Sequence, residues 1–331
     1  DVVFNGSMTL SSISGPITTS TIDGNESLTI NAGTGYFSVG SIGTTAAMGQ
    51  IELTANAQSF IQSIVTQSQP ITVNASTLLT SSSIIDSTNG GVAAGAAITL
   101  GSIGANSTGM SAETLTINAT SLGEGHLITL NGELGGGSNP LGSLTIQGSS
   151  ATSLVDIASS ISTNSIGTGP GGFITIEPQI TLTGPSTMST IAANSPGAAI
   201  SLPDVLADNL QTLVLLSGTS PTSVGSVGSS SQPMGAVSLT GGAITINGSV
   251  TAAGAIGSLS ITNSGALDIQ SGDVSLTGSF IQQGGGFVTL GSSITSGASI
   301  SFVNAISLTN DLSLYGAGGI TLSSTVDGGR V

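Results

Sequence analysis

A three-residue motif recurs along this chain: an aliphatic residue, then Ser or Thr, then another aliphatic residue. It occurs as Leu28-Thr29-Ile30, as Ile71-Thr72-Val73 and as Ile320-Thr321-Leu322, with many related triplets between them. From position 28 to position 312, the triplets are spaced about 19 residues apart on average. Alternation of apolar and polar residues is typical of a strand with one buried and one exposed face. A short strand that returns at this period predicts a solenoid of stacked turns.

A longer repeat supports this interpretation. Gly40-Ser41-Ile42-Gly43 returns as Gly101-Ser102-Ile103-Gly104, as Asn164-Ser165-Ile166-Gly167 and as Gly225-Ser226-Val227-Gly228. The four serines are almost evenly spaced, and each step corresponds to about three turns. We therefore expect an all-β parallel β-helix (β-solenoid) with about 19–21 residues per turn. We expect one continuous domain over residues 1–331, complete in itself or part of a longer chain.

Composition separates this fold from its competitors. Aromatic residues make up 3% of the chain and Trp is absent, whereas β-sandwich domains usually bury a large ring on a defined strand. Hydrophobic residues make up 38%, which is too many for a disordered Gly/Ser linker. Asn residues follow several triplets, and two interpretations stay open for them: a ladder of stacked side chains, or local turn chemistry. They are Asn31, Asn74, Asn118 and Asn131.

The charge balance excludes several classes of function. The formal net charge is −15, Lys is absent and Arg330 is the single Arg. Nucleic-acid binding requires Lys and Arg to neutralise phosphates, so we expect no nucleic-acid partner. No run of about 18 apolar residues occurs, so we expect no membrane span. The absence of Cys excludes a disulfide framework.

Two segments carry a resemblance to a known family. Glu26 to Gly35 reads ESLTINAGTG, and Ala236 to Val250 reads AVSLTGGAITINGSV. Both resemble the repeat regions of filamentous-haemagglutinin-like secreted bacterial adhesins. The resemblance implies a right-handed parallel β-helix displayed extracellularly or at the cell surface. It also implies adhesion or filament formation, and it implies nothing about catalysis.

Parallel β-helices also occur among enzymes that act on polysaccharides, so the alternative is a carbohydrate-binding or carbohydrate-cleaving protein of tailspike type. A glycoside hydrolase needs two carboxyl groups about 5–10 Å apart. Asp204 with Asp208, and Asp268 with Asp273, are the candidate pairs. The single His, His126, follows a Gly-rich turn and is expected to be exposed. We expect no catalytic residue and no cofactor.

Calcium is the ion that best suits an acidic, secreted solenoid. Asp204 or Asp208 would supply a carboxylate to such a site, together with backbone carbonyls. The Gly-Gly-x-Gly-x-Asp repeat of calcium-binding β-helices is absent. The sequence therefore leaves metal binding open.

The two ends of the sequence suggest self-association. The chain begins with the strand-like Val2-Val3-Phe4 and finishes soon after the triplet at residues 320–322, without a charged amphipathic helix at either end. Terminal turns of a solenoid expose unpaired backbone groups, which are normally capped. We therefore expect end-to-end association into filaments, or a stalk, with host or cell-surface glycans as further partners. End contacts of this kind would bury four aromatic residues: Phe280, Phe287, Phe302 and Tyr315.

Overall fold

The computed structural model describes residues 2–106, 113–120, 127–136, 138–148, 154–164, 172–191, 196–255 and 257–328. Within these residues all regular elements are β-strands and none is a helix, which confirms the all-β prediction. The strands pair in parallel from one turn to the next and form a β-solenoid of about 14 turns. The chain divides into unit 1, Asp1–Gln179, and unit 2, Ile180–Val331. That residues 1–331 form one continuous solenoid stays a prediction.

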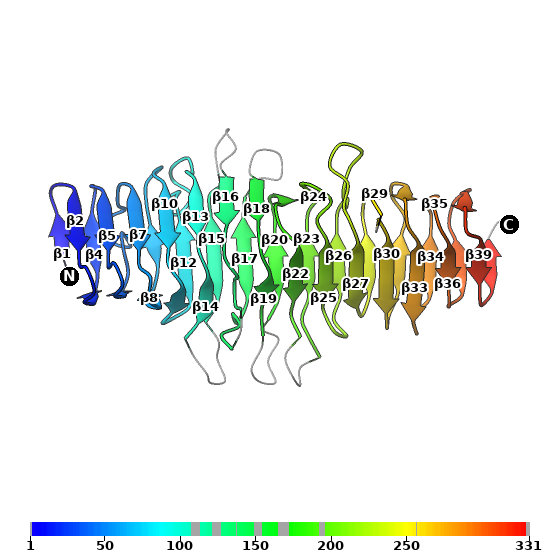
Figure 1. Cartoon of the computed structure of the whole chain (residues 1–331), viewed down its shortest axis with the longest axis horizontal. Helices are drawn as coiled ribbons and strands as arrows, with labels where there is room; N and C mark the ends of the chain where they lie inside the picture. The colour runs from blue at the N-terminus through cyan, green and yellow to red at the C-terminus, as the bar shows by residue number, and fades with distance from the viewer. Residues whose placement is uncertain are drawn as a thin grey trace. The chain divides into compact units, whose positions relative to one another are not determined.

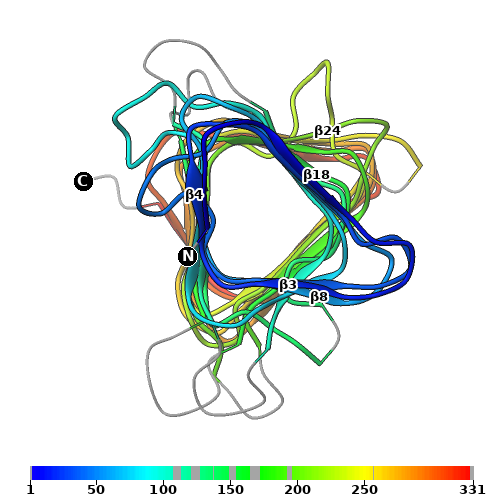
Figure 2. The same cartoon turned by 90° about the vertical axis from the view of Figure 1, so that its left-hand side faces the viewer.

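Unit 1 has three parallel sheets, which we call 1A, 1B and 1C. Figure 2 shows β4, β18 and β3 on three different sides of its turns. Sheet 1A contains β1 (Val2–Phe4), β4 (Ile22–Gly24), β9 (Ile64–Val65), β12 (Ser83–Asp86), β15 (Leu115–Asn118), β17 (Leu144–Gln147) and β20 (Ile174–Ile176). Sheet 1B contains β2 (Met8–Ser11), β5 (Leu28–Asn31), β7 (Ile51–Thr54), β10 (Ile71–Asn74), β13 (Ile98–Leu100), β16 (Leu127–Leu130) and β18 (Leu154–Ile157). Sheet 1C contains β3 (Ile17–Thr19), β6 (Phe37–Val39), β8 (Ser59–Ile61), β11 (Thr77–Leu79), β14 (Ile103–Ala105) and β19 (Ile161–Ser162).

Unit 2 also has three parallel sheets, 2A, 2B and 2C, whose strands are labelled in Figure 1 where space allows. Sheet 2A contains β23 (Ile200–Leu202), β26 (Thr222–Val224), β28 (Ile244–Ile246), β31 (Leu267–Ile269), β34 (Val288–Leu290), β37 (Ile306–Leu308) and β40 (Val326–Gly328). Sheet 2B contains β21 (Gln179–Leu182), β24 (Val205–Ala207), β29 (Val250–Ala252), β32 (Val274–Leu276), β35 (Ile294–Ser296) and β38 (Leu314–Gly316). Sheet 2C contains β22 (Ser186–Ser189), β25 (Leu213–Leu216), β27 (Val237–Gly241), β30 (Leu259–Asn263), β33 (Phe280–Gly284), β36 (Ile300–Phe302) and β39 (Ile320–Leu322).

The interior consists of aliphatic columns. In sheet 1B, Leu28, Ile51 and Ile71 occupy one register position in three successive turns, and all three are fully buried. In sheet 2A, Ile244 and Leu267 pair in the same way and are also fully buried. Burial of one such side chain contributes about 1.5–3 kcal/mol. The columns therefore stabilise each turn through the turns above and below it.

Turn length agrees with the prediction in part of the chain and exceeds it elsewhere. In sheet 2B, Val274 pairs with Ile294, and the turn between them has the predicted length. In sheet 1B, Ile98 pairs with Ile128, so this turn is half as long again as the turn from Val274 to Ile294. The triplet at residues 115–117 lies between these two partners but belongs to sheet 1A. The average triplet spacing underestimated the length of such turns because they contain more than one triplet, on different sheets.

The Gly-Ser-Ile-Gly repeat does not return at the same place in the solenoid. Ile42 forms bridges to its neighbouring turns in sheet 1A, Ile103 lies in β14 of sheet 1C, and Val227 forms bridges in sheet 2B. The copy at residues 164–167 falls, apart from Asn164, outside the described residues. The interpretation of this spacing as three complete turns was therefore wrong.

A different recurrence is structural. Gly43, Gly135 and Gly228 have φ of 71°, 72° and 73°, and each follows a single-residue bridge that replaces a strand. The chain then leaves the sheet as a short loop. It returns at a buried apolar residue, respectively Met48, Leu141 and Met234. Left-handed backbone and the lack of space for a Cβ atom both require glycine here.

Three large rings are fully buried in the interior: Phe37 in unit 1, and Phe280 and Phe302 in unit 2. Phe280 and Phe302 are fully buried on successive turns of sheet 2C, with ring centroids 4.9 Å apart. They are core residues, so the prediction that end contacts would bury them was wrong. Phe287 and Tyr315, in contrast, are largely exposed.

Candidate functional site

The two predicted carboxylate pairs do not converge. Asp204 and Asp208 flank the two ends of strand β24, and the extended chain between them spans about 13 Å. Asp204 instead supports a neighbouring loop, because its Oδ1 accepts a hydrogen bond from the Ser226 backbone N–H (2.6 Å). Asp268 lies in β31 of sheet 2A, whereas Asp273 directly precedes β32 of sheet 2B. Neither pair therefore has the facing arrangement that glycoside hydrolysis requires.

The structure also bears on the other candidate groups. Among the described residues, no three His, Cys, Asp or Glu side chains lie close enough together to hold a metal ion. His126 and Arg330 lie outside the described residues. In the same described part of the chain, no helix is long and apolar enough to cross a membrane.

The middle residues of the triplets form outward-facing columns, as predicted. In sheet 1B, Thr72 pairs with Thr99 and Thr99 pairs with Thr129, on strands whose flanking residues are buried. Neighbouring positions are about 4.8 Å apart. The corresponding column of sheet 2A contains hydroxyl and carboxyl side chains only: Ser201, Ser223, Thr245, Asp268, Thr289, Ser307 and Asp327.

Turn chemistry is confirmed for the Asn residues, whereas a ladder of stacked Asn side chains is not: Thr54 lies opposite both Asn31 and Asn74, and Asp86 and Gln147 lie opposite Asn118. Asn31 Oδ1 accepts a hydrogen bond from the Gly33 N–H (3.0 Å), which is local turn chemistry. Asn118 Nδ2 donates to Thr88 Oγ1 of the neighbouring turn (3.1 Å), and Asn118 also accepts from Thr120 within its own turn. The side chain of Asn118 thus joins two turns and shapes the segment that follows its own strand.

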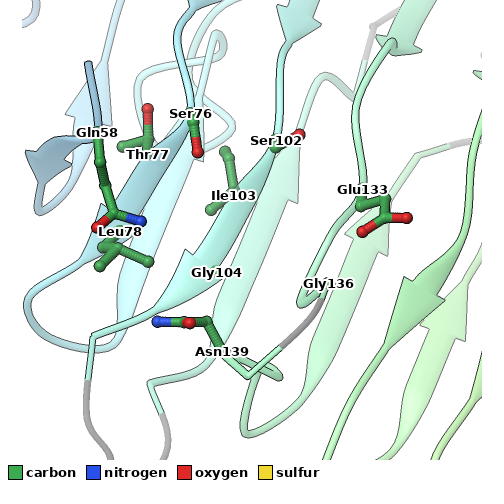
Figure 3. Close-up of a pocket in the computed structure, with 10 residues that line it drawn as sticks. All are labelled: Gln58, Ser76, Thr77, Leu78, Ser102, Ile103, Gly104, Glu133, Gly136 and Asn139. Carbon is green, nitrogen blue, oxygen red and sulfur yellow. The ribbon is translucent and has the colours of Figure 1, made fainter.

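A hollow of about 250 Å³ opens on sheet 1C. Its floor is formed by Thr77, Leu78, Ile103 and Gly104 of strands β11 and β14, and its far wall by Glu133, Gly136 and Asn139. Figure 3 shows the amides of Gln58 and Asn139 on the Leu78 side of the hollow, with Glu133 on the opposite side. Ser76 and Ser102 complete the lining.

Backbone hydrogen bonds hold the far wall against the sheet. The Ile103 N–H donates to the Glu133 carbonyl (3.0 Å), and the Ala105 N–H donates to the Asn139 carbonyl (3.0 Å). The Asn139 side chain returns a bond from its Nδ2 to the Ala105 carbonyl (2.9 Å). A Cβ atom on Gly104 would lie 2.8 Å from Asn139 Cβ, so only glycine lets the wall approach this closely. The hollow is therefore a built feature of the fold.

Several polar groups in the hollow are available to a ligand. Within the described residues, the Gln58 amide, the Ser76 and Ser102 hydroxyls and the Glu133 carboxylate form no side-chain hydrogen bond inside the protein. The Asn139 amide uses one of its donors on Ala105 and retains its oxygen. Together these groups offer both donors and acceptors, with one negative charge.

An apolar platform continues from the hollow across two further turns. Phe60 is the register neighbour of Leu78, and Tyr36 contacts Phe60 edge-on, with ring centroids 6.2 Å apart. Tyr36 is 38% exposed, Phe60 is half-buried, and Leu78 lies deepest, at the floor of the hollow. We call the hollow and the platform together the 1C groove; it comprises Tyr36, Phe60, Leu78 and the hollow-lining side chains Gln58, Ser76, Ser102, Glu133 and Asn139.

Strands β8 and β11 depart from the usual pattern of the solenoid at their first two positions. Ser59 and Thr77 occupy the inward position and are buried, while Phe60 and Leu78 occupy the outward position. The two inward hydroxyls bond to backbone groups, as in the bond that the Phe37 N–H donates to Ser59 Oγ (3.2 Å). The analysis of the triplets overlooked these strands because Ser59-Phe60-Ile61 and residues 77–79 lack the aliphatic first residue. An apolar residue that follows an inward hydroxyl is a signal for an outward apolar side chain, and it also occurs at Ile84 of β12, outside the groove.

The chain matches no protein-family model, no curated protein and no solved structure. The similarity to filamentous-haemagglutinin-like adhesins therefore remains a resemblance of repeat style. What the structure shows is the class of protein, a parallel β-solenoid repeat protein.

Proposed function

We propose that this chain is a structural protein that works outside the cell or at the cell surface, as an adhesin stalk or as a subunit of a filament. Its role requires no catalysis, cofactor or resident metal ion. The β-solenoid fold is compatible with this role. The outward columns of short polar side chains support it as well, because they form a surface with few reactive groups.

The observation that carries the proposal is the exposed inner face of strand β39 in unit 2. Ile320 and Leu322 of β39 are 43% and 41% exposed, although their register partners one turn earlier, Ile300 and Phe302, are fully buried. Val326 of β40 is likewise 45% exposed. Strands with apolar inner positions and unpaired backbone groups favour packing against a further strand layer. A second copy of the chain or a further turn of a longer chain would provide that layer, and the first of these gives end-to-end association.

Electron microscopy and analytical ultracentrifugation of the purified chain test this proposal. We expect concentration-dependent assembly in the wild type. Leu322→Lys should abolish it, because the charge is placed on the exposed inner face of β39. Thr321→Lys is the matched control, since Thr321 is the outward residue of the same strand and should leave assembly unchanged. A wild type that stays monomeric at high concentration, or equal effects of the two variants, contradicts the filament and leaves the adhesin stalk.

The alternative is a carbohydrate-binding or carbohydrate-cleaving β-helix of tailspike type. One observation, the 1C groove, favours carbohydrate binding. Cleavage is not favoured, because Glu133 is the one carboxylate among the residues that line the hollow.

A further inference from the structure

We propose that the 1C groove binds an uncharged oligosaccharide. The proposal concerns a site on unit 1 and is independent of self-association through β39 of unit 2. It rests on the apolar platform, the unpaired polar groups of the hollow, the charge of the site and the state of the surrounding backbone.

The platform provides the apolar half of sugar recognition. A pyranose ring presents a face of C–H groups, which packs on aromatic and aliphatic side chains, and a rim of hydroxyls. Tyr36, Phe60 and Leu78 lie on adjacent turns and form an apolar surface that descends into the hollow. Tyr36 also carries a phenolic hydroxyl, which suits a surface that is apolar on one side and wet on the other. In β8 and β11 the outward position holds Phe60 and Leu78, and the inward position before it holds a buried hydroxyl residue.

The hollow provides the polar half. Hydroxyl groups of a sugar both donate and accept hydrogen bonds, and so do the Gln58 amide and the Ser76 and Ser102 hydroxyls. These groups, with the Asn139 oxygen and Glu133, converge on about 250 Å³. Binding sites for small molecules commonly combine an apolar lining with a few fixed polar groups in this way. A hollow of this size accommodates one ring, while the platform supports the rings that follow.

Charge restricts the ligand class. Glu133 is the single charged residue of the groove, the chain has no Lys, and its one Arg is Arg330. Sulfated or uronic-acid sugars carry anionic groups that would face a carboxylate without a cation to pair with them. The groove therefore favours an uncharged sugar.

The backbone of sheet 1C argues against a peptide as the occupant. Peptides that add to a sheet need a free strand edge. Strands β8, β11 and β14 are each paired with a neighbouring strand along the groove, and the carbonyls of Glu133 and Asn139 accept hydrogen bonds from β14. Recognition at this face must therefore use side chains. The outward positions Ser38, Phe60, Leu78 and Gly104 follow one another at steps of about 4.8 Å. Together they form a row that is long enough for a short oligosaccharide.

Isothermal titration calorimetry of the full chain tests the proposal with four probes. Three are uncharged (cello-, manno- and N-acetylated chito-oligosaccharides) and the fourth is the acidic oligogalacturonate. We expect at least one uncharged probe to bind and oligogalacturonate not to bind. Phe60→Ser should weaken binding at least about tenfold by removing the platform. Gln58→Ala should weaken it about threefold to tenfold by removing one amide.

Two controls keep the outcome specific. Phe287→Ser removes an exposed aromatic residue of unit 2 and should leave binding unchanged. Glu133→Gln removes the carboxylate of the groove and should allow oligogalacturonate to bind, which tests the charge argument. Circular dichroism and thermal melting verify that each variant is folded, and Gln58→Ala replaces Phe60→Ser if the latter does not fold.

Three results overturn the proposal. They are that no uncharged probe binds at millimolar concentration, that oligogalacturonate binds more tightly, or that Phe287→Ser weakens binding as much as Phe60→Ser. A failure here leaves the assembly test of Leu322→Lys unaffected, so the two proposals are separable.

Discussion

In unit 1 Ile98 pairs with Ile128, whereas in unit 2 Val288 pairs with Ile306, so the first of these turns is more than half as long again as the second. Both pairs are stacked aliphatic residues at the same kind of inward position, and all of these side chains are buried. The difference in length lies in the segments between the strands. A solenoid thus keeps its interior constant while its outer segments vary, because only the inward residues have to meet a partner at every turn.

The two units also differ in how they use buried polar groups. In unit 1, Asp86 Oδ1 accepts bonds from the N–H and the hydroxyl of Thr88, and its Oδ2 accepts from the Gly90 N–H (2.7 Å). In unit 2, the buried amide of Gln282 donates to Asn263 Oδ1 and accepts from the Val303 N–H. The carboxylate shapes a loop on the outside of unit 1, whereas the amide is built into the interior of unit 2.

The largest effect tests whether the two interiors are equivalent. Phe37 and Phe302 are both fully buried, one in each unit. We expect Phe37→Ala and Phe302→Ala each to lower the free energy of unfolding by about 3–5 kcal/mol, because each leaves a cavity. Phe302→Ala should cost about 1 kcal/mol more, since it also removes the ring contact with Phe280. Urea denaturation followed by circular dichroism measures both. A small effect in one unit alone would break the equivalence of the interiors.

The next effect tests the recurrent glycine. A Cβ on Gly43 would collide with the Val65 carbonyl oxygen, and one on Gly228 with the Thr251 carbonyl oxygen. We expect Gly43→Ala and Gly228→Ala to lower the free energy of unfolding by about 2–3 kcal/mol each, through left-handed strain and overpacking. Gly285→Ala is the control, because nothing lies within 4 Å of its Cβ position. Urea denaturation measures the free energy of unfolding of all three variants. Equal losses for Gly43→Ala and Gly285→Ala would refute the role that we assign to the recurrent glycine.

The smallest effect sharpens the contrast in buried polar groups. We expect Asp86→Ala and Gln282→Leu to cost about 1–3 kcal/mol each, because each leaves backbone N–H groups without an acceptor. Hydrogen exchange separates the two variants. Protection should fall at Gly90 in Asp86→Ala, and at Val303 and Asn304 in Gln282→Leu. Loss of protection throughout unit 1 in Asp86→Ala would show that the carboxylate supports more than its loop.

Most of the fold could be predicted from sequence, but only part of the candidate site. Alternation identified strands such as Ile98–Leu100 correctly, since an aliphatic residue on either side of Thr suits a half-buried strand. It did not assign strands to sheets, because that depends on the length of each outer segment. Phe60 and Leu78 were overlooked because each of their strands begins with a hydroxyl residue instead of an aliphatic one. Asn139 reaches the hollow only because Gly104 leaves room for it, a contact between segments that are distant in the sequence.

The sequence by itself determined the class of fold and its chemical character. Repeated aliphatic-Thr-aliphatic triplets require a stack of half-buried strands, and a chain without Lys cannot present a basic surface. Tertiary structure alone decided which strands stack on one another, where polar groups are buried and where the 1C groove opens. The physical reason is that the local alternation of a strand determines which of its residues face inward. The length of each turn determines which outward side chains become neighbours on successive turns. That length differs widely between the pairs compared above.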